Sequence, residues 1–352
     1  MKELFYKLIR SAITPFCTPK HFGSLPHLTD THIVYVLPHR SVFDLASLDI
    51  LARKLSLARP VTDSSKKNQE IAPSILYLFR GSLLTKVRPN FASDLEDCFK
   101  LTKHSQQKVA FIPCTVFWGR SLAFKKAKTS IWPTHWSHPG LRKKLNNLFL
   151  TWGDTWIHFG EPIYLDNLIE REQIAPISQR RLARLLRSAI QNQKATTLGP
   201  NFENRTELLN SIATSNAVKD SLTNHPDQSE TLPRKIADSI ASNMSYPTIR
   251  ALTFLLNWFW NRIYEGIELT GIDKVNAVSR THSLIYVPCH RSHVDYLLLS
   301  FLLFHKGLMI PHIAAGDNLN IPILGRILRQ GGAFFMRRSF SGDELYSQVF
   351  KE

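Results

Sequence analysis

Residues Ile33–Asp44 read IVYVLPHRSVFD and residues Leu284–Asp295 read LIYVPCHRSHVD, so the two stretches are identical at six of twelve positions. Each begins with an apolar run typical of a buried strand and ends in a polar turn that starts a helix. A second block of similarity, around Arg88 and Arg337, follows 49 residues after the first histidine and 47 residues after the second. Two matched blocks repeated at about 250 residues indicate a duplicated domain rather than a solenoid.

Strand and helix patterns alternate around these blocks. Val109–Val116 and Thr155–Phe159 predict further strands, and Arg180–Gln193 predicts a basic amphipathic helix. The polar stretch Thr197–Thr231 predicts a connector with short helical pieces, and Ile236–Gly266 predicts one long helix. The alternation predicts an α/β fold, in which two duplicated domains of strands flanked by helices are joined by a helical segment.

The expected division of the chain has four parts. An amphipathic helix covers residues 1–20, a first domain 21–198, a helical connector 199–268 and the beginning of a second domain 269–352. The first copy continues after its second block through FIPCTVFWGR at Phe111–Arg120, and the second copy has no counterpart of this stretch. We therefore expect the second copy to be incomplete.

The composition points to an anionic partner. The 352 residues include 44 Lys and Arg against 28 Asp and Glu, which gives a formal net charge of +16. Such an excess suits nucleic acid, an acidic membrane surface or a phosphorylated substrate. The chain has no RNP, KH or zinc-finger pattern, so we expect no nucleic-acid partner. Four scattered cysteines do not form a disulfide framework.

Membrane contact is predicted to be peripheral. The apolar stretches Ala251–Trp260 and Tyr296–Phe304 fall short of the ~20 residues that a spanning helix needs. Met1–Pro19 has the spacing of an amphipathic helix, which either docks on its own domain or lies in a lipid interface. Together with the positive charge, this segment predicts electrostatic association with an anionic membrane surface.

His290 and Asp295 form the first candidate site. A histidine at the end of a strand and a carboxylate in the first turn of the next helix can pair, which leaves one imidazole nitrogen as a base. Ser292 and Asp295 also have the spacing of a capping box, and the two roles are compatible. Cys289 is a poor candidate for a nucleophile, because adjacent side chains on an extended segment point apart. His293 adds a possible ligand, but no second cluster completes a metal site.

The second candidate site is GGAFFMRR at Gly331–Arg338. Glycines, an apolar strand and then two arginines suit phosphate recognition, because arginine is always charged and donates two parallel hydrogen bonds. An isolated arginine pair is more often a basic surface. The fixed distance from the His/Asp block favours the phosphate site.

Taken together, the two blocks resemble the first two sequence blocks of the glycerolipid acyltransferase family. VPCHRSHVDYLLL, PHIAAGDNLN, GGAFFMRR and the preceding WNRIYEGIEL are similar to bacterial membrane-bound glycerol-3-phosphate 1-O-acyltransferases. The resemblance implies transfer of a fatty acyl group from acyl-carrier protein or acyl-CoA to the sn-1 hydroxyl of glycerol 3-phosphate, which gives lysophosphatidic acid in the first step of phospholipid synthesis. We expect a location at the cytoplasmic face of the inner membrane and no bound cofactor or metal. By the same resemblance, His290 is the general base, Asp295 orients it, and Gly332, Arg337 and Arg338 bind the glycerol phosphate.

The sequence also departs from the family pattern. An E-G-x-R-S-R segment, the family's third block, is absent from both copies, and the V-P-type fourth block is absent from the second copy. We therefore expect little activity from the chain as it stands. The first copy keeps His39 and Asp44 but has a single Arg88 followed by Pro89, so we expect it to be non-catalytic. The alternative is a lipid-surface-binding scaffold without catalysis.

Overall fold

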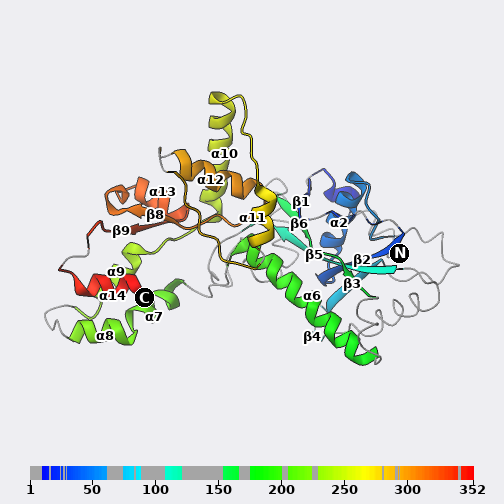
Figure 1. Cartoon of the computed structure of the whole chain (residues 1–352), viewed down its shortest axis with the longest axis horizontal. Helices are drawn as coiled ribbons and strands as arrows, with labels where there is room; N and C mark the ends of the chain where they lie inside the picture. The colour runs from blue at the N-terminus through cyan, green and yellow to red at the C-terminus, as the bar shows by residue number, and fades with distance from the viewer. Residues whose placement is uncertain are drawn as a thin grey trace.

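The computed structural model contains both strands and helices, as the predicted α/β class requires, and has two regions (Figure 1). One region is a sheet flanked by helices, and the other is a helical region with a short sheet. The structure describes residues 10–15, 17–23, 25–26, 28, 30–61, 74–82, 85–88, 108–120, 154–165, 175–199, 205–223, 229–279, 281–289, 292, 294–339 and 342–352.

The strands in these residues are β1 (Lys20–Phe22), β2 (Thr31–His39), β3 (Ile75–Ser82), β4 (Thr85–Arg88), β5 (Lys108–Trp118), β6 (Thr155–Phe159), β7 (Ile163–Tyr164), β8 (Ile313–Gly316) and β9 (Ala333–Met336). The helices are α2 (Val42–Lys54), α6 (Ala175–Leu198), α7 (Arg205–Ala213), α8 (Asn216–Thr223), α9 (Leu232–Ile240), α10 (Tyr246–Ile263), α11 (Ile272–Ser279), α12 (Val294–His305), the 3₁₀ turn η2 (Asp317–Leu319), α13 (Leu324–Gln330) and α14 (Glu344–Lys351).

A seven-stranded mixed sheet organises the N-terminal region, with the order β1-β6-β5-β2-β3-β4 and β7 paired to β5. β2 is central and runs parallel to both β3 and β5. Its alternating residues are buried on both faces: Val34 and Val36 pack toward α6, whereas Ile33, Tyr35 and Leu37 pack toward α2. A strand buried on both faces reads as a continuous apolar run, which is why the sequence predicts it correctly.

The described end of the N-terminal amphipathic segment docks on this region. Residues 10–13 are helical, and Ile13 and Cys17 are buried against Ala46 and Trp118. Arg10 Nη1 lies 3.0 Å from the buried carboxylate of Asp49. Of the two alternatives for this segment, docking therefore applies to its second half. Residues 1–9 lie outside the described part of the chain.

The C-terminal region contains a parallel pair, β8 and β9, with α12 and α13 beside it. The first residue of α10, Tyr246, and Phe304 of α12 share a buried cluster with Met244, Ile249 and Ile310. A second cluster joins α14 to the short helices of the connector: Leu209, Val218, Ile236, Ala237, Leu345, Tyr346 and Val349. The predicted short helices of the polar connector are confirmed as α7 and α8.

The prediction of one long helix over Ile236–Gly266 is wrong, because α9 ends at Ile240 and α10 begins at Tyr246. The backbone amides of Asn243 and Ser245 instead donate to carbonyls at the end of α13. Pro247 lies in the first turn of α10, where its missing N–H is tolerated.

The strand predicted at the start of Leu284–Asp295 is also absent: residues 283–289 have no regular secondary structure in the described part of the chain. Ile285 is 90% exposed and Val287 is 88% exposed. A strand requires a hydrogen-bonded neighbour, and an apolar run supplies only the propensity for one.

Within the described residues, no helix has the length and apolar character to cross a bilayer.

Candidate functional site

The predicted base, His290, lies outside the described residues, as do Arg291 and His293. The structure describes the chain up to Cys289 and again at Ser292, just before α12. The pairing of His290 with Asp295 therefore stays a prediction.

Asp295 lies in the first turn of α12 and caps it. Its Oδ2 accepts a hydrogen bond from the backbone N–H of Ser292 at 3.2 Å, and Ser292 Oγ accepts from the N–H of Val294 at 3.2 Å. This is the reciprocal pattern of a capping box. The capping role that the sequence left open is thus present, and a partly exposed carboxylate is held at the start of the helix.

Asp44, which matches Asp295 in the repeated sequence block, has a different environment. Asp44 is only 5% exposed, and its Oδ1 accepts a hydrogen bond of 2.6 Å from the indole N–H of Trp118. Ser41 Oγ accepts from the N–H of Asp44 at 3.2 Å, so a serine hydroxyl caps α2. The sequence did not single out Trp118, because a tryptophan at the end of a strand does not indicate which distant carboxylate it will meet.

Gly332 connects α13 to β9 in a conformation that favours glycine. Its φ is +114°, and a Cβ placed there would lie 2.8 Å from Met244 Cε and 3.2 Å from the carbonyl oxygen of Pro311. The carbonyl oxygen of Gly332 accepts from the N–H of Ile313, next to the β8–β9 ladder. The structure therefore gives Gly332 a backbone and packing role, while its predicted contact with substrate stays a prediction.

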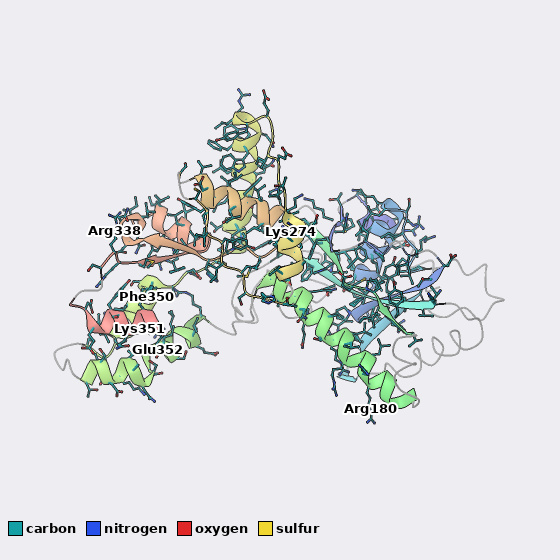
Figure 2. The ribbon with its side chains drawn as sticks, viewed as in Figure 1. Arg180, Lys274, Arg338, Phe350, Lys351 and Glu352 are labelled. Atoms are coloured by element: carbon teal, nitrogen blue, oxygen red, sulfur yellow. The ribbon has the colours of Figure 1, made fainter. Side chains whose placement is uncertain are left out.

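The two arginines that follow β9 differ in their contacts. Arg337 Nη1 donates to Asp343 Oδ2 at 2.7 Å, and its guanidinium lies 4.3 Å from the ring centroid of Tyr346. Arg338 is exposed, and within the described residues no partner is recorded for its side chain. Figure 2 shows Arg338 at the side of the C-terminal region that faces away from the seven-stranded sheet. One arginine is thus held locally and the next is accessible to a ligand.

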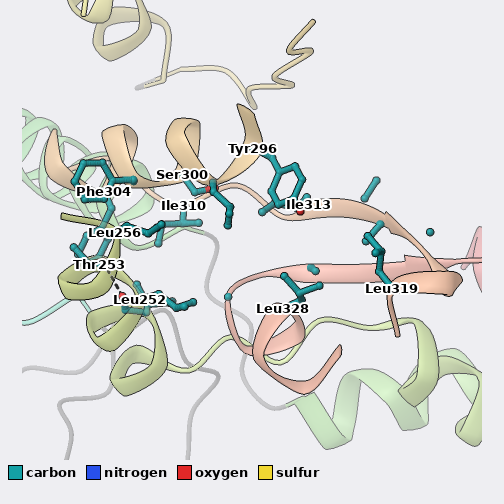
Figure 3. A pocket seen from close by; sticks show the side chains of 18 residues that line it. Leu252, Thr253, Leu256, Tyr296, Ser300, Phe304, Ile310, Ile313, Leu319 and Leu328 are labelled. Carbon is teal, nitrogen blue, oxygen red and sulfur yellow. Dashed lines mark hydrogen bonds between the residues drawn. The ribbon is translucent and has the colours of Figure 1, made fainter. Parts of the chain in front are cut away.

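An apolar cavity of about 140 Å³ lies between α10, α12, β8 and α13. Figure 3 shows Phe304 at one end of this cavity, with Tyr296, from the first turn of α12, and Leu319, just after β8, toward the other. Ser300 Oγ is buried at its wall and has no hydrogen-bond partner in the described part of the chain. The other lining residues are Ile249, Leu252, Thr253, Leu256, Leu297, Phe301, Ile310, Ile313, Ala314, Ala315, Gly316, Leu328, Gly331 and Ala333.

A larger space of about 910 Å³ borders the segment 281–288. It shares four lining residues with the apolar cavity, so the two spaces adjoin along α12 and β8: Tyr296, Ser300, Ile313 and Ala314. His312 also lines this space; burial lowers the pKa of its imidazole, and its Nδ1 lies 2.9 Å from Ser242 Oγ.

No group of three or more His, Cys, Asp or Glu side chains in the described residues could hold a metal ion. Because His290 and His293 lie outside that part, the expectation of a metal-free site stays a prediction.

Two family models match the chain. Residues 1–199 match the glycerol-3-phosphate acyltransferase PlsB N-terminal domain, and residues 266–351 match the acyltransferase domain. The chain belongs to the PlsB family of glycerol-3-phosphate acyltransferases. Both matches agree with the resemblance carried by the two sequence blocks.

Curated relatives of this PlsB-family chain cover nearly all of it. It is 36% identical over 342 residues to the glycerol-3-phosphate acyltransferase of Pseudomonas paraeruginosa strain PA7, and 37% identical over 336 residues to that of Pseudomonas fluorescens strain Pf-5. Each alignment covers 91% of this chain and 40% of the relative. The chain therefore spans well under half the length of these relatives.

Proposed function

We propose that this chain carries the acid–base and phosphate-binding part of a glycerol-3-phosphate acyltransferase. The substrate would be glycerol 3-phosphate, the donor acyl-carrier protein or acyl-CoA, and the product lysophosphatidic acid. The observation that carries the proposal is the capped, partly exposed Asp295 at the start of α12, five residues after His290, in a chain with named acyltransferase relatives.

In the proposed reaction, His290 accepts the proton of the sn-1 hydroxyl while that oxygen attacks the thioester carbonyl of the donor. The tetrahedral intermediate then collapses, the new ester forms, and the thiolate leaves with the proton returned by the imidazolium. Asp295 holds the imidazole in the correct tautomer and stabilises its charged form. The Ser292–Asp295 cap supports this role, because it limits the orientations available to the carboxylate.

The phosphate would be bound after β9 by Arg338 and Arg337. The exposure of Arg338 suits a ligand that arrives from solvent. The guanidinium of Arg337 has five N–H donors, so its ion pair with Asp343 leaves capacity for a phosphate oxygen. Gly332 supports the site by fixing the start of β9.

The acyl chain would enter the apolar cavity beside α12. A cavity of about 150 Å³ lined by apolar side chains accommodates a benzene-sized group, so the volume here suits the end of a hydrocarbon chain. Tyr296 lies at the end of the cavity nearest the first turn of α12, next in sequence to Asp295. This arrangement favours an acyl donor whose thioester lies near the proposed base.

We also propose that the two regions are duplicated acyltransferase-like domains and that the first is non-catalytic. In the first, β2, α2 and β3 follow in order, with Asp44 at the start of α2. In the second, the irregular segment 283–289, α12 and β8 follow in the same order. The indole N–H of Trp118 donates a hydrogen bond to the carboxylate of Asp44, which supports a structural role for this carboxylate in the first copy. The copies differ at the second block, since β4 is antiparallel to β3 whereas β9 is parallel to β8.

An anionic membrane surface is the partner that we propose for α10. Figure 1 shows this helix projecting from the C-terminal region, and its outer part carries exposed Phe254, Leu255 and Trp258, at 80%, 55% and 61%. Aromatic side chains with a polar edge favour the membrane–water interface. The net charge of +16 adds attraction to anionic lipids. Such contact at the cytoplasmic face of the inner membrane would bring the site close to its lipid product.

Flotation with liposomes tests the membrane contact. Phe254→Asp combined with Trp258→Asp should reduce retention on anionic vesicles, whereas the control Ile285→Asp, at an apolar residue that is 90% exposed on another segment, should not. Raising the salt concentration should weaken the binding that remains. Equal retention of the unmutated chain, the double variant and Ile285→Asp on anionic vesicles would contradict a role for α10.

Kinetics test the catalytic proposal in a completed chain, made by joining this chain to the C-terminal part of the Pseudomonas fluorescens relative. His290→Ala should lower kcat by roughly 10²–10⁴, the usual contribution of positioned proton transfer. Asp295→Asn should lower kcat as well, because an amide cannot stabilise the imidazolium. The control His39→Ala should leave kcat within a few-fold. A harmless His290→Ala would contradict the assignment of the base. No turnover by the unmutated completed chain, with liposome binding intact, would favour the lipid-surface scaffold instead.

A further inference from the structure

A buried group of charged and aromatic side chains joins the seven-stranded sheet to the C-terminal region. Its centre is Asp154, just before β6, whose carboxylate accepts hydrogen bonds from Tyr246 Oη at 2.6 Å and Trp156 Nε1 at 2.8 Å. The same carboxylate lies 3.9 Å from Arg120 Nη2 and 3.7 Å from Arg250 Nη1. Tyr246 and Arg250 belong to α10, so one acidic side chain of the sheet region holds the start of that helix.

Arg120 extends this contact to α12. It follows β5 and is 2% exposed, and its Nη1 donates to the carbonyl oxygen of Phe304, the penultimate residue of α12. Its guanidinium carbon lies 3.7 Å from the ring centroid of Phe304 and 4.5 Å from that of Trp156. The last carbonyls of a helix lack partners within the helix, and a cation placed there is favourable. Arg120 therefore supplies a charged donor to the end of α12 from the other region of the protein, in addition to the backbone N–H of Gly307, which lies 3.3 Å from the same carbonyl oxygen.

The backbone fixes Arg120 in place. β5 and β6 are antiparallel, and their ends meet where Gly119 N donates to Asp154 O at 2.9 Å. The arginine and its carboxylate partner thus extend from adjacent strand ends. A buried guanidinium would be unfavourable without such a partner.

We propose that Arg120 is a positioning residue for acyl transfer: it anchors the C-terminal end of α12, and so fixes the direction of the helix whose first turn carries Asp295. The inference rests on the proposed function, since it takes the part of Asp295 in that reaction as given. A helix is a rigid element with a rise of about 1.5 Å per residue, so a change of direction at Phe304 displaces the side chains at its beginning. The region of the seven-stranded sheet, which we propose is non-catalytic, thereby helps to position the catalytic groups of the C-terminal region.

Arg120→Met tests the proposal. Methionine keeps an apolar side chain between the Trp156 and Phe304 rings but removes the hydrogen bond and the charge. Asp154 keeps its contacts with Arg250 and two hydrogen-bond donors, so gross unfolding is not expected. The matched control is Arg59→Met, since Arg59 also pairs with a buried carboxylate of the sheet region, Asp49, at 3.1 Å.

Two measurements give the result. Hydrogen exchange of the 352-residue chain should become about tenfold faster in peptides of α12 with Arg120→Met, without a change in those of β2 and β5. In the completed chain, kcat should fall roughly 10–100-fold, as for a small misplacement of a catalytic group, while the KM for glycerol 3-phosphate stays within about twofold. Arg120→Lys should restore part of kcat, because it restores the cation at the end of α12. Arg59→Met should change neither readout.

Each contrary result has one meaning. Unchanged exchange in α12 with Arg120→Met would overturn the anchoring, and unchanged kcat with faster exchange would overturn the positioning role. If Arg59→Met lowers kcat as much as Arg120→Met does, Arg120 is a general stabilising residue and the proposal is overturned. No acyl transfer by the unmutated completed chain would instead refute the proposed function, and with it the part of Asp295 on which the inference depends.

Discussion

Substitution of Gly332 by alanine separates a structural role from a substrate-binding role at the second sequence block. The family resemblance assigns Gly332 to glycerol phosphate, whereas the structure gives it a φ of +114° and a crowded environment. The added methyl group would lie 2.8 Å from Met244 Cε and 3.2 Å from the carbonyl oxygen of Pro311. The methionine can move, but the backbone oxygen lies next to the β8–β9 ladder and cannot.

The cost follows from two contributions. A non-glycine residue in a sparsely populated region of φ costs about 1–3 kcal/mol. Overpacking against a fixed neighbour adds about 1–3 kcal/mol, part of which the flexible methionine relieves. We therefore expect Gly332→Ala to lower the free energy of unfolding by about 2–4 kcal/mol.

Urea unfolding followed by far-UV circular dichroism measures this free energy. Gly331→Ala is the matched control, because Gly331 has a φ of −82° and its added Cβ would lie 3.3 Å from Leu328 O. The gain from reduced chain entropy offsets this tighter contact, so the control should stay within about 1 kcal/mol of the unmutated chain. If Gly332→Ala also unfolds within about 0.5 kcal/mol of the unmutated chain, the packing argument fails and a direct substrate role becomes the better explanation.

Three further predictions concern charged and titratable groups. Burial would raise the pKa of Asp154, but the charges of Arg120 and Arg250 and two hydrogen bonds hold this pKa below its ordinary value. Its contribution to stability is therefore present above pH about 4 and lost as the pH falls through the lowered pKa. Asp154→Asn should lower the free energy of unfolding by about 3–5 kcal/mol at neutral pH, because it leaves buried Arg120 without its carboxylate. In acid, the free energy of unfolding of this variant should depend less on pH than that of the unmutated chain. Burial lowers the pKa of His312, so the imidazole is protonated at a higher pH in the unfolded chain than in the folded one. The stability of the folded chain should therefore fall as the pH drops below about 6.5. The urea midpoints at about pH 7.5 and 5.5 should differ less in His312→Gln than in the unmutated chain. Arg337→Ala loses a half-exposed ion pair with Asp343 and the cation–π contact with Tyr346, so it should cost at most about 2 kcal/mol of stability. In the completed chain it should nevertheless raise the KM for glycerol 3-phosphate without changing that for the acyl donor. An unchanged KM would mark Arg337 as a surface residue.

The sequence by itself determined the elements whose signals are local. The strand at Ile33–Leu37 follows from side-chain pattern alone, because a strand buried on both faces needs apolar residues in succession. The strand at Thr155–Phe159 follows from its β-branched and aromatic residues. The cap of α12 by Asp295 is equally local, since Ser292 lies three residues away and the first turn of a helix brings the two together. The two sequence blocks were sufficient to indicate the family to which the chain belongs.

Only the tertiary structure decided the contacts between distant residues. Trp118 meets Asp44 across 74 positions, and Arg120 meets Phe304 across 184. Nothing local to either residue indicates its partner, since such contacts depend on which strand ends become neighbours when the sheet forms. The same reason explains the errors at residues 283–289 and 241–245. An apolar run becomes a strand only beside another strand, and a helical pattern continues only where the backbone amides have no better acceptors elsewhere in the fold.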